Sequence, residues 1–498
     1  NDLTLVRGRH QIGLGVNLAY WTVDMWAYSR GNGQYTFNGQ NTGLGLGDFL
    51  LGRPSAFVQG NRVGVAFHQW YKGVFVQDAW RATDRVTVNA GLRWEPYTGQ
   101  EFYDTSVAHF SLDGYRRGVK SGMFVNAPAG FSYFGDPGYE RRSGTKNQWW
   151  NLGPRVGVAW DVSGDGRLAV RTSYGLAYDF PAAETWWGAA GGPPYSNRLS
   201  LTNPPGGFDD PYATVGGSPF PLVTNRNMQF IPFGLFGAVD PDNNSPRVQQ
   251  WNLTIEQQLG SAWGVSATYL GSHSDRLWNK KSINPGVYLG LGPCTINAVA
   301  YPVCSTNANL NQRRKFSLET PALAGPLGFV DQHNAVGWQS YHGLRLTVAR
   351  RAASGLSISG NYTLSTCEGT ATPGSFAQIA SGYTNPDNPD MDRGHCDQDR
   401  TQLANATVGY MIPALDNRIL NIVASNWRMS GILSARSGQW MNIITGTDNA
   451  LNGQIGQRPN QVSDDVYGAK TLTSYLNRAA FAAPAPGTFG NLEYRAVE

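Results

Sequence analysis

The amino-acid sequence predicts an all-β protein: an antiparallel, up-and-down transmembrane β-barrel, present in part as roughly thirteen or fourteen strands. Three observations predict it. Apolar and polar residues alternate over long segments, charged residues are scarce, and short turns alternate with long loops along the chain. Charged residues make up 15% of the sequence, against about 25% in soluble domains. The mean hydropathy is nevertheless only −0.35, so apolar residues are interleaved with polar ones.

Alternation with a period of two residues is clearest in the segment 168–178. Leu168, Val170 and Tyr174 share one side of this segment, and Arg171 and Ser173 lie on the other. Ten steps of about 3.3 Å, tilted by about 40°, project to about 25 Å, the height of the apolar band on membrane barrels. The same alternation predicts strands at 86–95, 251–259, 344–348, 356–364 and 427–433.

The connections between these strands differ in length at the two ends. Short polar turns are expected at 81–85, 163–166, 260–263 and 351–355, and long loops at roughly 99–151, 180–246, 278–337 and 366–400. Short periplasmic turns and long extracellular loops are typical of a membrane barrel. The alternative is a soluble β-sandwich or propeller, whose strands average only about 5–6 residues.

Several segments, in order along the chain, resemble a known family. The paired segments YKGVFVQDAW (71–80) and RVTVNAGLRWE (85–95) resemble the paired strands of TonB-dependent outer-membrane receptors, in particular the Oar-like barrels. Further matching segments are GRH (8–10), GDFLLGRP (47–54), PRVGVAWD (154–161), YGLAYD (174–179), QWNL (250–253), YLGS (269–272), YTLS (362–365) and the stretch 481–491.

The resemblance implies that residues 1–498 form an incomplete receptor barrel domain, with the N-terminal plug and the C-terminal closing strands outside this sequence. It further implies a place in the cell outer membrane of a Gram-negative-type bacterium, in contact with outer-membrane lipid. The whole receptor would bind an unknown ligand on its extracellular loops. It would import that ligand with energy from the TonB complex, which acts through the plug segment.

Two other functions remain open from the sequence. An adhesion or scaffold barrel would use the same loops without transport, and a secreted β-rich carbohydrate-active enzyme would need a convergent pair of carboxylates. We expect no enzyme activity and no cofactor. Ser272, His273 and Asp275 are close in sequence, but such adjacency does not make a catalytic triad. Nucleic-acid binding is not expected, because the net charge is only +4 and the basic residues are scattered.

The four cysteines fall in two pairs within or beside the predicted extracellular loops. Cys294 and Cys304 lie in one loop, whereas Cys367 ends a strand and Cys396 precedes the next. An even number of cysteines in the loops of an exported protein indicates two disulfides. Free thiols are one alternative, and metal ligation with the neighbouring His395 is another.

Two further groups of loop residues are candidate sites. Asp390 and Asp392 begin like a calcium-binding loop, but no glutamate follows at the twelfth position, so we expect a solvated loop and keep calcium as the weaker alternative. The repeat at 43–47, with glycine at every second position, is expected to be a flexible segment. Aromatic side chains in the loops are candidate ligand contacts, or they pack the loops together: Trp149, Trp150, Trp186, Trp187 and Tyr195.

Overall fold

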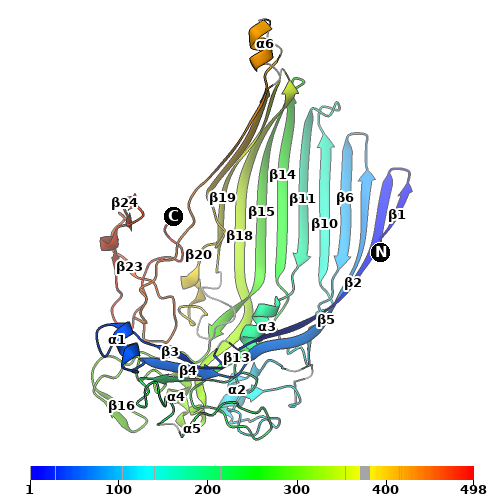
Figure 1. Cartoon of the computed structure of the whole chain (residues 1–498). Coiled ribbons are helices and arrows are strands. Elements are labelled where there is room, and N and C mark those ends of the chain that lie inside the picture. The colour runs from blue at the N-terminus through cyan, green and yellow to red at the C-terminus, as the bar shows by residue number, and fades with distance from the viewer. Residues whose placement is uncertain are drawn as a thin grey trace.

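The computed structural model describes residues 2–498 except 29, 104, 140, 214–215, 354, 371–381, 414–415, 417 and 425–426. Its main feature is a single large sheet in which twelve strands lie side by side in sequence order, each antiparallel to the next (Figure 1). These strands are β1 (Asp2–Arg7), β2 (His10–Ala27), β5 (Val63–Arg81), β6 (Val86–Trp94), β10 (Leu152–Asp161), β11 (Leu168–Tyr178), β14 (Arg247–Leu259), β15 (Trp263–Ser282), β18 (Leu327–Ala353), β19 (Leu356–Gly369), β21 (Gln402–Met411) and β22 (Arg428–Arg436).

The predicted up-and-down antiparallel wall is confirmed, and three shorter strands bring the sheet to 15. The predicted strands are all present, and several are longer than expected, most of all β15 and β18. β15 and β18 continue into the segment 278–337, which we expected to be a loop, and pair there as far as Ser282 with Asp331. Alternation could not reveal this extension, because most of its residues, on both faces, are buried beneath the loops.

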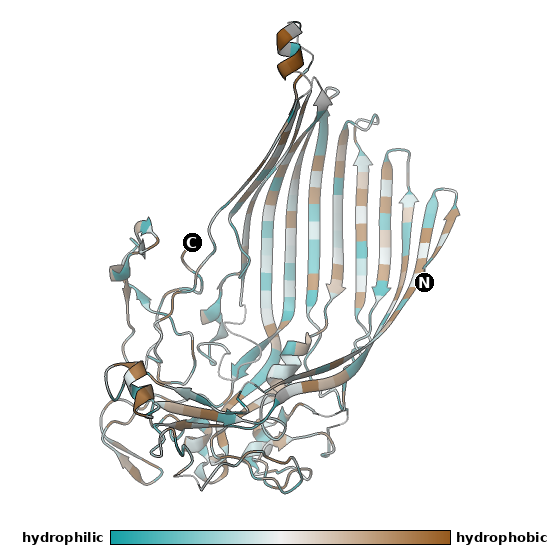
Figure 2. Cartoon of the chain, viewed as in Figure 1, coloured by the Kyte–Doolittle hydropathy of each residue, from teal (hydrophilic) through white to brown (hydrophobic). Residues whose placement is uncertain are grey.

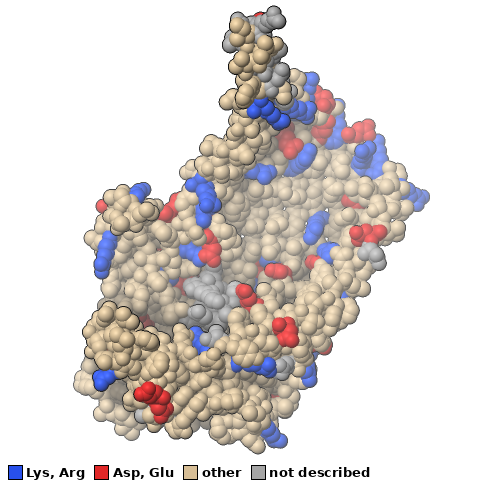
Figure 3. Space-filling model, viewed as in Figure 1, with Lys and Arg blue, Asp and Glu red and all other residues tan. Residues whose placement is uncertain are grey.

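The two faces of the sheet differ in polarity as the alternation predicts. One cross-strand row is apolar and runs Trp160, Val170, Ile255, Ala267, Leu346. The adjacent row, one residue along each strand, runs Ala159, Arg171, Thr254, Thr268, Arg345. Figure 2 shows the resulting bands along the strands, and Figure 3 shows charged side chains mainly at the strand ends and over the loops.

The apolar face has no second layer of protein over it within the described part of the chain. Leu92, Trp160, Ile255 and Leu346 are each between 43% and 48% exposed. In a soluble sandwich this face would form the core between two sheets. The soluble alternative therefore does not fit the structure.

Short turns join the strands at one end of the sheet. In the turn between β10 and β11, the Asp161 carboxylate accepts hydrogen bonds from the backbone N–H groups of Gly164 and Gly166 at 2.8 and 3.0 Å. Both glycines have φ near +80°, a conformation that side chains disfavour.

The β21–β22 connection is the exception, since it carries the short helix α6 (Arg418–Ala424), which the sequence did not predict (Figure 1). Among the described helices, none has the length and apolar character that a membrane crossing requires.

The long connections gather at the opposite end of the sheet and form a cap (Figure 1). Its elements are β3 (Gln34–Thr36), α1 (Gly45–Leu50), β4 (Ala56–Gly60), β7 (Glu101–Phe102), β8 (His109–Phe110), α2 (Leu112–Arg116), β9 (Phe131–Ser132), α3 (Ala183–Ala189), β12 (Arg198–Thr202), β13 (Gly234–Val239), β16 (Cys294–Ile296), β17 (Val299–Tyr301), α4 (Lys315–Glu319), α5 (Pro321–Ala324), η1 (Pro389–Asp392) and β20 (Gly394–His395). The segment that follows β22 packs beside the cap and carries β23 (Asn460–Gln461), β24 (Tyr467–Thr471), β25 (Ser474–Leu476), η2 (Arg478–Ala480) and β26 (Phe481–Ala482).

The apolar core of the protein lies in this cap. Phe131 and Phe236, from distant loops, approach each other with ring centroids 4.8 Å apart. A second cluster places the Trp186 ring 5.0 Å from that of Trp278, which lies in the extension of β15. The loops are therefore a packed body that is continuous with the sheet.

Buried arginines connect the loops of the cap to one another. Arg313 donates to the Asn309 side chain at 2.9 Å and to the carbonyl of Leu451 at 3.1 Å. Arg458 pairs with the Asp392 carboxylate at 2.5 Å and donates to the carbonyl of Leu492 at 2.8 Å. Because a buried charge is costly unless it is bonded, these contacts hold the loops in one arrangement.

We predict that acid destabilises the cap through His333, which is 1% exposed. Burial, with a smaller contribution from Lys280, lowers its pKa to about 3. Between about pH 6.5 and 3 the unfolded chain therefore binds more protons than the folded chain, and stability falls as the pH falls, by about 1.4 kcal/mol per pH unit. Urea unfolding followed by tryptophan fluorescence at a series of pH values measures this slope.

The variant His333→Gln should lose most of the slope. A smaller slope should remain, because burial also lowers the pKa of His109. An unchanged slope in this variant would show that His333 is not the responsible group.

Candidate functional site

The polar face of the sheet carries a continuous row of side chains that alternate between long and short. Gln77 and Arg155 are separated by Gly91, and Arg155 and Gln250 are separated by Gly175. From β1 to β19 the whole row is Thr4, Gly13, Gln77, Gly91, Arg155, Gly175, Gln250, Ser272, Tyr341 and Cys367. We call this row the polar belt.

Two glycines of the polar belt make room for Gln77. A Cβ atom on Gly13 or on Gly91 would lie 3.1 Å from the Gln77 side chain, whereas one on Gly175 would lie at an ordinary contact distance, 3.5 Å from Arg155 Cγ. The Gln77 side chain can therefore lie flat along the wall. Alternation along each strand predicts the polar face. The succession of long and short residues from one strand to the next depends on the register between strands, which the sequence does not reveal.

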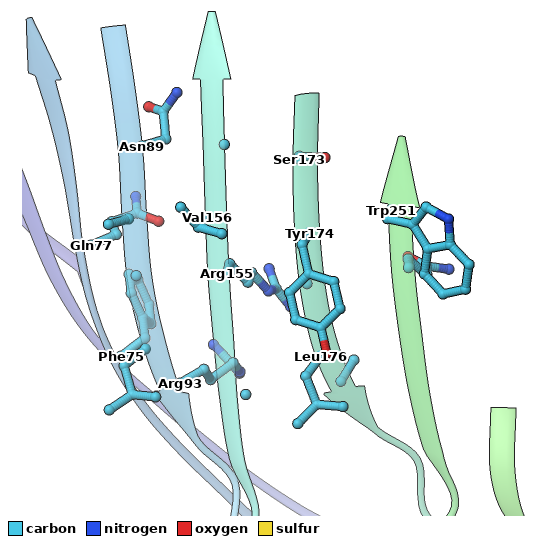
Figure 4. A pocket seen from close by; sticks show the side chains of 18 of the residues that line it. Phe75, Gln77, Asn89, Arg93, Arg155, Val156, Ser173, Tyr174, Leu176 and Trp251 are labelled. Carbon is cyan, nitrogen blue, oxygen red and sulfur yellow. The ribbon is translucent and has the colours of Figure 1, made fainter. Parts of the chain in front are cut away.

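A hollow of about 1070 Å³ lies over the polar belt, and most of the residues that line it belong to the polar face. Figure 4 shows Gln77, Arg93 and Arg155 on three neighbouring strands that line it. Arg93 pairs with Glu95 at 2.6 Å and donates to the Tyr71 hydroxyl at 2.6 Å, so its charge is balanced. Arg155 is exposed and has no carboxylate partner among the described residues. It is the cation that this hollow offers to an anionic group.

The aromatic candidates of the loops divide into packed and exposed residues. Trp186 is fully buried, and Trp187 and Tyr195 pack against the two core clusters of the cap. In this structure these three side chains therefore hold the loops together. Trp149 and Trp150 are 47% and 83% exposed at the start of β10, so they remain candidates for ligand contact.

The acidic candidates are used in packing. Asp392 is fully buried, pairs with Arg458 and accepts a hydrogen bond from the Thr384 N–H at 2.6 Å. Asp390 lies beside it in η1. The solvated loop that we expected is, at Asp392, a buried ion pair. The described residues contain no group of three or more His, Cys, Asp or Glu that could hold a metal ion.

Both expected disulfides are present. Cys294–Cys304 closes the β16–β17 hairpin, and Cys367–Cys396 joins the end of β19 to β20. Because each of the four sulfurs is bonded within one of these two disulfides, the alternatives of free thiols and of metal ligation do not hold in this structure. His395, the partner considered for a metal, instead bonds Asp399 at 2.7 Å.

The segment 271–275 does not assemble a catalytic triad. Asp275 forms an ion pair with Arg247 at 2.6 Å, and His273 bonds the Ser340 hydroxyl at 2.8 Å. Ser272 and His273 are neighbours on β15, so their side chains point to opposite faces of the sheet. His273 and Asp275 are therefore each bonded to a residue of a neighbouring strand and not to each other.

One exposed apolar surface was missed by the sequence reasoning. The repeat at 43–47, expected to be flexible, opens the helix α1, whose buried Asp48 accepts hydrogen bonds from the N–H and hydroxyl of Thr42 at 2.9 Å. Leu46 and Leu50 are 61% and 75% exposed there. The run of apolar residues at 49–51 was the available signal.

Comparison with known proteins gives a family for the whole chain. Residues 1–498 match the family model described as "Outer membrane beta barrel domain". No curated protein matches the sequence.

Several solved structures are similar to part of this chain. The outer membrane transporter YddB from Escherichia coli is 11% identical over 87% of this chain and 45% of its own, with a TM-score of 0.37. The FrpB iron transporter from Neisseria meningitidis is 10% identical over 84% and 40%, with a TM-score of 0.38. The siderophore receptor PiuA from Acinetobacter baumannii is 11% identical over 82% and 42%, with a TM-score of 0.36. The chain spans less than half the length of each of these proteins.

We predict that the two disulfides contribute unequally to the stability of the cap. Cys367–Cys396 closes 29 residues and Cys294–Cys304 closes 10. Because a longer closed loop restricts the unfolded chain more, the pair Cys367→Ala and Cys396→Ala should cost about 4 kcal/mol, and the pair Cys294→Ala and Cys304→Ala about 3 kcal/mol. Urea unfolding of the two double variants measures both losses. The reverse order would contradict this account.

Proposed function

Since the chain belongs to the family of outer membrane β-barrel domains, we propose that it is part of the barrel wall of a TonB-dependent receptor. The receptor binds a ligand on its extracellular loops and imports it with energy from the TonB complex. The Oar-like subfamily is the one that the segments at 71–80 and 85–95 resemble. The outer membrane is the place where such a wall operates, with its apolar face in lipid.

The observation that carries the proposal is the combination of a polar belt, a hollow of about 1070 Å³ over it and an exposed apolar face behind it. In the described sheet, β1 and β22 each pair with one neighbour only. Lipid does not tolerate unpaired strand edges, so we infer that further strands close the wall. Barrels of 16 strands or more leave an interior wide enough for a channel or a plug.

The groups that would meet a ligand are those that packing leaves exposed. Trp149 and Trp150 offer aromatic faces at the cap, and Arg155 with Gln77 and Gln250 offers a cation and amides along the wall. Aromatic faces at the cap, followed by a cation and amides along the wall, suit a ligand that carries both an apolar or planar part and an anionic or polar part.

Energised uptake separates this function from adhesion. Cells that carry the whole protein and cells that lack its gene are grown in the same medium, and mass spectrometry identifies any solute that only the first cells deplete. Transport predicts at least one such solute, whose depletion stops when a protonophore abolishes the proton gradient. An adhesion or scaffold barrel predicts equal depletion by both strains, which would contradict the proposal.

If the apolar face of the wall lies in lipid and the polar face in water, the same substitution on the two faces should change the stability of the protein by different amounts. Leu253 belongs to the apolar face and is 45% exposed, whereas its neighbour Thr254 belongs to the polar face. Leu253→Arg should cost about 2–4 kcal/mol in lipid vesicles, because arginine is unfavourable near the middle of the bilayer. Thr254→Arg should cost about 1 kcal/mol or less, since it faces water. Reversible urea unfolding of the two variants in vesicles compares them, and equal costs would place both faces in the same surroundings.

A further inference from the structure

The apolar face of the wall carries a groove of about 660 Å³ that spans the strands from β14 to β22, which we call the acyl groove. Its floor is made of small residues that the register brings together on β19 and β21, where Gly360 pairs with Ala406 and Ala404 lies two residues along β21. Val348 and Leu433 flank this floor, because they pair with Gly360 and Ala406 from the two sides. The next row along the strands, Leu346 and Tyr362, borders the floor as well.

Close packing around the backbone does not explain why the floor of the acyl groove has glycine at position 360. A Cβ atom on Gly360 would meet no atom closer than 3.5 Å, so the backbone packing does not require glycine there. The flanking Leu346 and Leu433 are 46% and 63% exposed and stand above the floor. The wall is therefore hollowed where larger apolar side chains would have fitted.

A cation stands at the short-turn end of the acyl groove. Arg350 is two residues beyond Val348 on β18, so both side chains lie on the apolar face, about 7 Å apart along the strand. Its guanidinium lies 5.6 Å from the ring centroid of Trp263, and its Nη1 donates to the carbonyl of Leu356 at 2.8 Å. Arginine and tryptophan at the end of an apolar band are typical of the membrane interface, where lipid phosphates lie.

We propose that the acyl groove holds one acyl chain of a phospholipid of the periplasmic leaflet, with the phosphate of that lipid at Arg350. The groove is continuous with the face that lies in lipid, and short turns mark the periplasmic end of a membrane barrel. Its contents must therefore be apolar, and the cation at its end selects an anionic group. The inference rests on the position of the wall in the outer membrane and is independent of transport.

The groove suits a lipid chain better than a second copy of the protein. A stable protein interface buries about 800 Å² on each partner and has a flat or interlocking core. The floor of glycine and alanine accepts a flexible chain at close range, where dispersion contacts accumulate. A lipid held there would exchange more slowly than its neighbours and would fill the hollow between β18 and β21.

Native mass spectrometry of the whole protein, purified from outer membranes in a mild detergent, tests the proposal. The probe is palmitoyl-oleoyl phosphatidylglycerol, compared with the diacylglycerol that has the same chains and no phosphate. We expect one phospholipid to be retained per protein. Ala406→Leu, which fills the floor, should lower its retention about tenfold, and so should Arg350→Gln, which removes the charge-assisted hydrogen bond to phosphate.

Matched variants control for general effects on folding and on the membrane surface. Ala90→Leu makes the same change on the apolar face of β6, away from the groove. Arg351→Gln removes the next charge along β18 and leaves Arg350 in place. Both variants should retain the phospholipid as the unaltered protein does. The proposal is overturned if the Ala406→Leu and Ala90→Leu variants retain the phospholipid equally. It is also overturned if the diacylglycerol is retained to the same extent as the phospholipid, or if the spectrum shows a dimer without bound lipid.

Discussion

The wall of this protein depends on one constraint: in hydrocarbon, each backbone N–H and C=O must find its partner within the protein. A sheet of consecutive antiparallel strands meets this demand strand by strand, from β1 to β22. Because side chains alternate across such a sheet, one face can be apolar while the other is polar. The row from Trp160 to Leu346 and the polar belt are the two consequences of the same hydrogen-bonded wall.

The same constraint explains why the apolar core lies in the cap. A wall one sheet thick, with lipid on one side and water on the other, has no interior of its own. The long connections build one instead, with Phe236 and Trp186 at the centres of two clusters. Buried arginines such as Arg313 and Arg458, bonded to carbonyls of distant loops, fix the arrangement of the loops that stand above the polar belt. The strands β15 and β18 extend into the cap and tie it to the wall.

The sequence predicts the features that depend on local periodicity and misses those that depend on contacts between distant residues. The strands at 86–95 and 168–178 and the short turns could be predicted, because alternation and turn residues act locally. Both disulfides could be predicted from the even number of cysteines in or beside the loops. The different roles of Trp186 and Trp150 could not, since both are tryptophans in long loops and only the packing of the cap separates them. The pairing of Asp392 with Arg458, 66 residues away, is hidden for the same reason.

The central claim is that the apolar face of the wall lies against lipid and the polar face against water. Its most direct test is a scan of nitroxide labels at single cysteines introduced at positions 251 to 256 of β14, in the whole protein reconstituted in lipid bilayers. Collision with oxygen, which concentrates in lipid, should dominate at 251, 253 and 255, and collision with a water-soluble nickel complex should dominate at 252, 254 and 256. A profile without this two-residue period, or one in which positions 253 and 255 are shielded from both reagents by protein, would contradict the account.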